Sequence, residues 1–280
     1  MKVLITGSKG QLGCEFKVLK NVTVHELIFV DRDTLDITNQ SDIDLFCKRQ
    51  NIKCIINCAA YTAVDDAEDY QDKAFAVNEK AVKNLVKVCE NQKIKLIHFS
   101  TDYVFNGENH KPYTESDKVN PIGVYGKSKR AGEEVILKSQ ISSLIIRTSW
   151  LYSEFGHNFM KSMIKLGRER DELRIVYDQV GTPTNALDLA MAVLGCIDQH
   201  KKWKNRQEVY HFSNEGVASW YDFALAIFEK ENISCEVKPI LSKDYPTKAE
   251  RPHYSVLDKT KLKTDFKLDI PHWLESLKSI

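Results

Sequence analysis

The sequence lacks any hydrophobic run approaching the roughly 20 residues that a membrane-spanning helix needs. Its opening segment reaches the turn at Gly7 too early for a secretory signal, so we expect a cytoplasmic protein with no membrane partner. An excess of either charge is also missing, because 40 Lys and Arg side chains are nearly balanced by 39 Asp and Glu. A near-neutral chain without a basic run has no electrostatic footprint for nucleic acid.

Cysteine pairs with the spacing of a metal site or of a disulfide framework are missing as well. The seven cysteines are odd in number, and Cys54 and Cys58 fall in one apolar run where they would share a face of an extended strand. We therefore expect reduced, mostly buried thiols. Metal binding or redox chemistry by these thiols is the alternative.

Short β-branched runs alternate with helical patterns through the first half of the chain. This alternation is typical of βαβ units around a parallel sheet. The expected strands are Val3–Thr6, Leu27–Val30, Cys54–Cys58, Leu96–Ser100 and Leu144–Arg147. The expected helices are Gln11–Leu19, Ser41–Arg49, Ala74–Glu90 and Tyr125–Leu137, the third with a core-facing stripe of Ala74, Val77, Ala81, Leu85 and Val88. The pattern predicts an α/β fold with a Rossmann-like, doubly wound parallel sheet.

After Trp150 the pattern loosens, and the chain is expected to weave between two lobes. Ser219 with Asp222 resembles a capping signal that opens a helix, and Pro239, Pro246 and Pro252 predict an irregular stretch suited to a substrate loop. The helices expected here are Asn158–Glu169, Leu187–Ile197 and Trp220–Lys230, and the strands are Arg174–Tyr177 and Val209–Phe212. We predict a dinucleotide-binding domain at residues 1–150, taking in about 175–212, and a smaller, discontinuous substrate-binding lobe mainly within 151–280.

Three glycines at three-residue spacing, Gly7, Gly10 and Gly13, follow the first strand and open the first helix. Such glycines permit a tight turn, close approach of backbone to a pyrophosphate, and packing of helix on strand, so that phosphate sits at the positive helix end. Ligand-free proteins use glycine in tight turns too, but the position after an N-terminal strand favours a dinucleotide site. Gln11 and Leu12 belong to the same expected site.

Asp31 and Arg32 follow the second strand, where such folds contact the adenosine ribose. The carboxylate suits a 2′-hydroxyl and the guanidinium suits a 2′-phosphate, so NADH and NADPH both stay open as cofactors. A solvated charge pair at a strand end is the alternative. Ala59, Ala60 and Tyr61 end the third strand, where small residues would let a cofactor approach the backbone, and simple packing is the other explanation.

Tyr125 and Lys129 lie four residues apart on an expected helix and hence on one face. A phenol with a pKa near 10 is a slow acid or base at neutral pH, but a nearby ammonium and an oxidised nicotinamide both favour its phenolate. The pair alone is a weak signal. Because ligands bind beyond the carboxyl ends of parallel strands, Ser100-Thr101-Asp102 at the end of the fourth strand adds to it. Together they predict a hydride-transfer site in which Thr101 hydrogen-bonds the reacting carbonyl.

At this point the chain resembles the extended short-chain dehydrogenases and, more narrowly, the dTDP-4-dehydrorhamnose reductase family. The matching segments keep the family's order over nearly the whole chain: Ile5–Gly13, Leu35–Thr38, Asn57–Asp65, Ala76–Asn78, Ser100–Gly107, Tyr125–Lys129, Arg147–Trp150, Asp178–Thr184 and Arg251–Pro252. No single motif is diagnostic, but the set is specific. The resemblance implies that NADPH or NADH reduces the 4-keto group of a nucleotide-sugar substrate, dTDP-6-deoxy-L-lyxo-4-hexulose, to give dTDP-L-rhamnose.

By this resemblance Tyr125 is the proton donor, Lys129 holds the nicotinamide ribose and supports the phenol, and Thr101 orients the keto oxygen. The resemblance also puts Asp36 and Asn78 in the cofactor cleft. The substrate contacts that it implies are Thr101, Asp102, Trp150 and Arg251. An indole face suits a sugar ring and a guanidinium suits a pyrophosphate, whereas a core Trp and a surface Arg are the plainer explanations.

Other activities on the same fold stay open. Tyr103 follows Thr101-Asp102 where sugar-nucleotide dehydratases resemble Thr-Asp-Glu, so the added acid that elimination needs is missing. Another NAD(P)-dependent sugar-nucleotide dehydrogenase or epimerase, or a non-catalytic regulatory subunit resembling the β subunit of methionine adenosyltransferase, are the alternatives. Some relatives are homodimers joined through Mg²⁺ on glutamates. Glu15 matches one such position, but Asp188 stands where another Glu is expected, so no metal is assigned.

Overall fold

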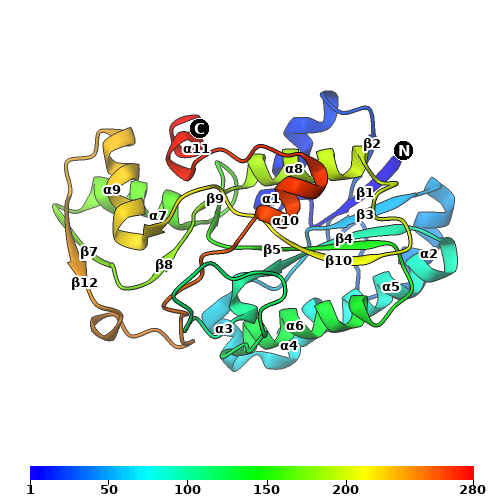
Figure 1. Ribbon diagram of the computed structural model, residues 1–280, viewed down its shortest axis with the longest axis horizontal. Coiled ribbons are helices and arrows are strands. Elements are labelled where there is room, and N and C mark those ends of the chain that lie inside the picture. Colours follow the sequence, from blue (N-terminus) through cyan, green and yellow to red (C-terminus); the bar gives the residue numbers. More distant parts are fainter.

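The computed structural model, which describes residues 1–280, is built around one sheet of six parallel strands (Figure 1). The strands are β1 (Lys2–Thr6), β2 (Glu26–Phe29), β3 (Cys54–Asn57), β4 (Lys95–Thr101), β5 (Ser143–Thr148) and β10 (Gln207–His211). Their spatial order is β10-β5-β4-β3-β1-β2. Because the order reverses beside β1, the connections before and after it leave in opposite directions and open a crevice at the carboxyl ends of the strands. The predicted doubly wound parallel sheet is confirmed.

Helices cover both faces of this sheet. Figure 1 shows α1, α8 and α10 on one side and α5 and α6 on the other. Their bounds, with those of α2 on the same face as α5, are Gln11–Val18 (α1), Gln40–Gln50 (α2), Ala81–Gln92 (α5), Val124–Leu137 (α6), Ala186–Asp198 (α8) and Thr260–Phe266 (α10). Each face has its own buried apolar cluster. None of the helices combines the length and the apolar character that crossing a bilayer would take.

The single helix predicted for Ala74–Glu90 is wrong at its start. The chain forms α4 (Gln71–Phe75), a π-helical turn at Ala76–Lys80, and only then α5. A π turn inserts one residue into the helical repeat, which rotates the side chains that follow. As a result Asn78 is buried and Val77, which was expected in the core stripe, lines a cleft instead. A shorter helix, α3 (Val64–Asp69), precedes this region.

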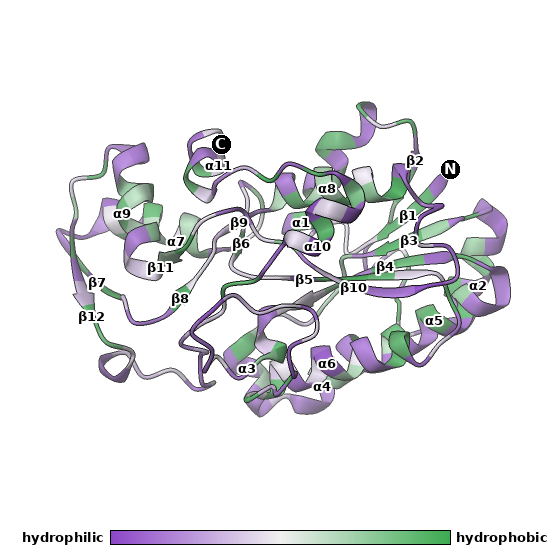
Figure 2. Ribbon diagram, in the orientation of Figure 1, coloured by the Kyte–Doolittle hydropathy of each residue, from purple (hydrophilic) through white to green (hydrophobic).

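The second half of the chain adds a smaller cluster of elements at one end of the molecule. They are β6 (Leu151–Tyr152), α7 (Phe159–Glu169), β7 (Glu172–Val176), β8 (Val180–Gly181), β9 (Thr184–Asn185), β11 (Ala218–Ser219), α9 (Trp220–Glu231), β12 (Glu236–Ile240) and α11 (Trp273–Lys278). Short 3₁₀ turns occur at Leu19–Asn21, Asp102–Val104 and Ser242–Asp244. Figure 2 shows that the apolar residues of α7 and α9 alternate with polar ones, as expected for helices with one buried face.

Two expectations for this half have different outcomes. The capping signal is confirmed, because the Ser219 and Asp222 side chains each bond the other's backbone N–H. The irregular stretch is wrong at Pro239, which lies inside β12 and pairs with Ile175 of β7. A proline is tolerated in a strand whose N–H side is unpaired, and this ladder has only two strands.

Candidate active site

Two of the three glycines are required by backbone packing. Gly7 has a φ of +63°, and a Cβ there would lie 2.7 Å from the backbone N of Ala59. A Cβ on Gly13 would lie 2.5 Å from the carbonyl oxygen of Gly7. Gly10 is different, because it is exposed and caps α1 without any side-chain hydrogen bond. The first N–H groups of α1 thus point into open space, which is the arrangement that binds phosphate.

A cleft of about 750 Å³ opens beside this turn. Eight of the residues predicted for the cofactor line it, namely Gly7, Gly10, Asp31, Arg32, Asp36, Ala59, Ala60 and Tyr61. Lys9 and Lys73 line it too, although neither was singled out from the sequence. Lys9 could have been identified from the sequence, because it is a basic residue inside the glycine turn itself. The dimensions and the positive helix end fit a dinucleotide.

The charges at the mouth of the cleft are distributed unevenly. The Asp31 carboxylate accepts hydrogen bonds from the backbone N–H groups of Asp33 and Thr34 and lies 2.7 Å from the Lys9 ammonium. Hydrogen bonding to Lys9 is the main reason that the pKa of Asp31 is lowered. Arg32, whose side chain is 87% exposed, has only Asp36 nearby at 3.9 Å. The acid is therefore engaged locally, whereas the guanidinium is available.

Asn78 lies behind the cleft wall and bonds the loop that lines it. Its Oδ1 accepts from the N–H of Tyr61 at 2.9 Å, and its Nδ2 donates to the Tyr61 carbonyl at 3.0 Å and to the Ser128 hydroxyl at 3.0 Å. The buried amide thus ties the cofactor loop to α6. Its effect on a cofactor would be exerted through Tyr61.

A second cavity of about 400 Å³ adjoins the first and shares Gly10, Cys58 and Ala60 with it. It brings together most of the remaining predicted residues, namely Gln11, Leu12, Thr101, Asp102, Tyr125, Lys129 and Trp150. Gln11 is held here by Asn158, whose Nδ2 donates to its Oε1 at 2.9 Å. Asn158, predicted as the first residue of a helix, caps α7, but its contact with Gln11 was not predicted from the sequence. Residues from the start of α1 and from the ends of β3, β4 and β5 therefore meet α6 in one place.

The side chains at the end of β4 form a buried polar group. Thr101 Oγ1 donates to Asp102 Oδ1 at 2.9 Å, and both residues are at most 4% exposed. Burial raises the pKa of Asp102 to about 6. Burial also raises the pKa of Tyr125, against a smaller opposing effect of the Thr101 hydroxyl. Burial therefore favours the protonated phenol.

Lys129 is the one ammonium in the cavity. It lies one turn after Tyr125 on α6, is 2% exposed, and donates from Nζ to the carbonyl oxygen of Phe99 at 2.5 Å. Burial lowers its pKa to about 8, with the charge of Glu133 acting in the opposite direction. The amine is protonated at neutral pH and loses its proton just above.

The two outermost predicted residues are both held by protein groups. Trp150 has a φ of +46°, and its ring stacks on Trp220 with centroids 3.5 Å apart, so at most one face is free. Arg251 Nη2 donates to Asp65 at 2.5 Å and its Nη1 lies 3.5 Å from the Tyr103 hydroxyl. Arg251 does not line the cavity but lies beside it.

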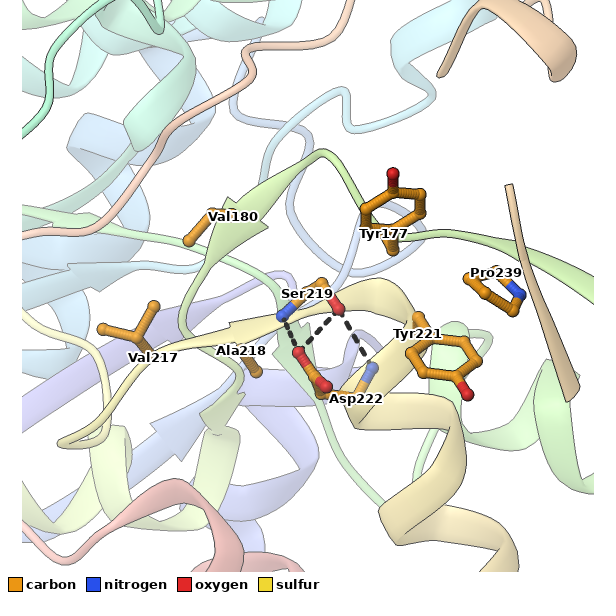
Figure 3. A pocket seen from close by; sticks show the side chains of 8 residues that line it. All are labelled: Tyr177, Val180, Val217, Ala218, Ser219, Tyr221, Asp222 and Pro239. Carbon is orange, nitrogen blue, oxygen red and sulfur yellow. Dashed lines mark hydrogen bonds between the residues drawn. The ribbon is translucent and has the colours of Figure 1, made fainter. Parts of the chain in front are cut away.

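A third hollow lies on the smaller cluster of elements (Figure 3). It has a volume of about 640 Å³ and shares no lining residue with the cavity around Tyr125. Its polar groups, Ser219 and Asp222, bond each other (Figure 3). Tyr177, Tyr221 and Pro239 are among the eight residues that line it.

Glu15 and Asp188, the two positions compared with the Mg²⁺-binding glutamates of relatives, both bond protein groups. Glu15 accepts from the Ser153 hydroxyl at 2.6 Å, and Asp188 accepts from Asn214 at 2.6 Å and from Ser276 at 2.5 Å. No group of three or more His, Cys, Asp or Glu side chains is placed to hold a metal ion. All seven cysteines are unpaired, as expected.

The doubly wound sheet, the glycine turn and the cavity holding Thr101, Tyr125 and Lys129 define an oxidoreductase of the extended short-chain dehydrogenase class. A family model described as the RmlD substrate binding domain matches residues 1–280. The chain is 39% identical to dTDP-4-dehydrorhamnose reductase of Aggregatibacter actinomycetemcomitans, covering 100% of this chain and 98% of that one. The chain belongs to the dTDP-4-dehydrorhamnose reductase family.

Solved structures agree with this assignment. A dTDP-4-dehydrorhamnose reductase from Clostridium acetobutylicum is 42% identical, with a TM-score of 0.93 over 100% of this chain and 98% of that one. One from Bacillus anthracis, solved in complex with NADP, is 37% identical, with a TM-score of 0.94 over 99% and 97%. A relative from Streptomyces niveus, 34% identical over 98% of this chain and 94% of its own, is named dTDP-4-keto-6-deoxy-D-glucose reductase. Family members therefore differ in the named sugar.

Proposed function

We propose that this chain reduces the 4-keto group of dTDP-6-deoxy-L-lyxo-4-hexulose to give dTDP-L-rhamnose. The observation that carries the proposal is the single cavity in which Thr101, Tyr125 and Lys129 meet the open end of the glycine turn. In this proposal residues 1–150 with about 175–212 hold the dinucleotide, and the remaining lobe holds the nucleotide sugar.

The residues have distinct roles in the proposed reaction. Tyr125, protonated at neutral pH because burial raises its pKa, donates a proton to the keto oxygen as the carbon gains a hydride. The dinucleotide, when bound, supplies that hydride and is left oxidised, so one carbonyl becomes one alcohol. Thr101 orients the keto oxygen by turning its single hydroxyl proton, which it donates to Asp102 in this structure, toward that oxygen. Lys129 holds the nicotinamide ribose and stabilises the phenolate that remains.

NADPH is the proposed cofactor. Asp31, the group suited to a 2′-hydroxyl, is engaged by Lys9 and by backbone N–H groups, whereas Arg32 is exposed at the cleft mouth. Because Lys9 neutralises Asp31, the two cations Lys9 and Arg32 favour binding of a cofactor that carries a 2′-phosphate. The similarity to the Bacillus anthracis structure with NADP supports the same choice.

The activity is tested by following NADPH absorbance with the dTDP-4-keto sugar as substrate. We expect one NADPH consumed for each dTDP-L-rhamnose formed, and a loss in Tyr125→Phe of about 10²- to 10⁴-fold in kcat. Tyr177→Phe, which removes a hydroxyl from the distant hollow, is the control. Product that forms without net cofactor oxidation would indicate an epimerase, and dTDP-4-keto-6-deoxy-D-glucose as the better substrate would reassign the sugar.

The cofactor choice has its own test. Arg32→Ser should raise the Kd for NADPH about tenfold, because a charge-assisted hydrogen bond to phosphate contributes about 1.5 to 3 kcal/mol, while the Kd for NADH stays within a factor of two. Fluorescence titration of the reduced cofactor measures both. Equal losses for the two cofactors would contradict a contact with the 2′-phosphate.

A further inference from the structure

A fully buried ion pair lies directly beneath the candidate catalytic residues. Glu133 on α6 is 0% exposed and Arg147 on β5 is 2% exposed. Arg147 donates from Nε and Nη2 to the two carboxylate oxygens of Glu133, both at 2.8 Å, and Arg130 adds a third bond at 2.9 Å. Sequence reasoning gave neither residue of the pair a role.

Strand pairing places Arg147 at the centre of a polar row. It is the register partner of Ser100 on β4 and of His211 on β10, and its Nη1 lies 3.4 Å from His211 Nε2. The next residue of β4 is Thr101, at the edge where the site lies. The clamp between Glu133 and Arg147 therefore fixes the rotation of α6 against β5, which pairs with the strand that carries Thr101.

Lys129 lies one helical turn before Glu133 on the same helix. Its ammonium bonds the Phe99 carbonyl, and no carboxylate forms a salt bridge with it. Its charged or titratable neighbours on α6 include Tyr125, Arg130 and Glu133. The buried charged or titratable groups on and after the nearby strands are His98 on β4, Asp102 after β4, Arg147 on β5 and His211 on β10. His98 lies close enough to Lys129 for the ammonium to disfavour its protonation, and burial does so more strongly. Glu133 is the only one of these groups whose charge favours the ammonium.

We propose that Glu133, clamped by Arg147, is a positioning residue for Lys129: it fixes the helical turn that carries the ammonium and supplies the buried negative charge that keeps it protonated. Opposite charge within about 4 to 6 Å favours a charged form, whereas burial disfavours it. The importance of a protonated Lys129 for catalysis rests on the proposed function. The charge relation between Glu133 and Lys129 does not.

The variants must distinguish an effect of the Glu133 charge on Lys129 from a loss of folding. Removing one partner of a buried pair leaves an unpaired charge and destabilises strongly, whereas replacing both with neutral groups of similar size is often tolerated. We therefore use Glu133→Gln together with Glu133→Gln/Arg147→Met. The matched control is Glu134→Gln, which removes the same charge one residue further along α6, from exposed pairs with Arg130 and Lys138.

The first readout is the titration of Lys129 itself, by NMR of ¹³C-labelled lysine side chains in the full-length protein, with Lys129→Arg identifying the signal. In wild type the midpoint is expected near the pKa of about 8. In Glu133→Gln it should fall by about one pH unit. In the double variant, which also removes the positive charge of Arg147, it should fall by less, and Glu134→Gln should leave it unchanged. An unchanged midpoint in every folded Glu133 variant would overturn the proposal.

The second readout is the pH profile of kcat/KM with NADPH and the keto sugar. Because the ammonium is lost at lower pH without Glu133, the alkaline fall in activity should move downward by about one pH unit in Glu133→Gln and by less in the double variant. A clamp that is only structural would lower activity equally at every pH, and that result would overturn the proposal. If wild type fails to turn the substrate over while the NMR midpoint still shifts, the proposed function fails and the charge relation stands.

Discussion

The two faces of the large sheet are made by the same strands but are filled differently. The face under α1 and α8 is apolar over most of its length, for example at Leu144 and Ile146 on β5. The face under α6 is apolar only at the amino ends of the strands and becomes polar at the carboxyl ends. The buried polar residues there are Thr6, Asn57, His98, Ser100, Arg147 and His211. Burial of polar groups destabilises a fold unless they are paired, so their concentration on one face marks the part of the core that serves the site.

Most of these polar groups are paired across the strands. Thr6 Oγ1 donates to Asn57 Oδ1 at 2.6 Å, and Asn57 Nδ2 lies 3.0 Å from Nδ1 of His98. Burial keeps the pKa of His98 well below its usual range, so the ring is neutral, and its Nε2 has no partner. The polar face therefore contains buried groups, among them His98 Nε2 and Ser100 Oγ, that have no hydrogen-bond partner.

The largest effect is expected on the apolar face, where packing alone stabilises. Leu144→Ala, at a fully buried position early in β5, should lower the free energy of unfolding by about 2 to 5 kcal/mol because a cavity forms. The pH profile of activity should not move. Urea unfolding measures the loss, with the exposed Leu45→Ala on α2 as the control. A shifted pH profile of activity in Leu144→Ala would contradict the conclusion that only the polar face serves the site.

Replacement of Asp102, at the polar edge of the sheet, is expected to raise the free energy of unfolding instead of lowering it. Burial raises its folded-state pKa from 3.8 to about 6, so the folded protein keeps a proton that the unfolded chain releases, and stability falls as pH rises through this window. Asp102→Asn removes that loss and should raise the free energy of unfolding at pH 7.5 by about 2 to 3 kcal/mol. The gain should vanish below pH 4.

Activity completes the test at this position. Because the Asp102 carboxylate holds the Thr101 side chain by a charge-assisted hydrogen bond, which a neutral amide makes more weakly, kcat/KM of Asp102→Asn should fall about tenfold. Thermal unfolding across pH 4 to 8, paired with the NADPH assay, checks both parts. A variant that is more stable and equally active would show that the carboxylate has no role in orienting Thr101.

A smaller effect is expected for Arg251, which lies in the C-terminal part of the chain beside the cavity around Tyr125. Arg251→Gln should raise the KM for the nucleotide sugar about tenfold, because a guanidinium bond to diphosphate is charge-assisted, and the KM for NADPH should not change. Lys248→Gln on the same segment, where the lysine pairs with Asp69, should change neither. If Arg251 pairs only with Asp65 and does not contact the substrate, Arg251→Gln will lower the free energy of unfolding and leave the KM for the nucleotide sugar unchanged.

Sequence patterns predicted the strands of the sheet to within two residues, because alternation and β-branched runs reflect local conformational preference and burial. They also placed Gly7, Gly10, Thr101 and Tyr125 at the ends of adjacent elements. The π turn at Ala76–Lys80 was missed. It packs closely on a distant helix, because a Cβ on Gly132 of α6 would lie 2.2 Å from the Asn78 carbonyl oxygen. No helical periodicity carries that information.

By itself the sequence determined the order of strands and helices, the glycine turn and the spacing of Tyr125 and Lys129, all of which depend on neighbours a few residues apart. Only the tertiary structure decided that Glu133 meets Arg147, that Asp65 holds Arg251, and that burial keeps the phenol of Tyr125 protonated. These contacts depend on strand register and on exclusion of water. Both arise only when segments far apart in the chain are packed together.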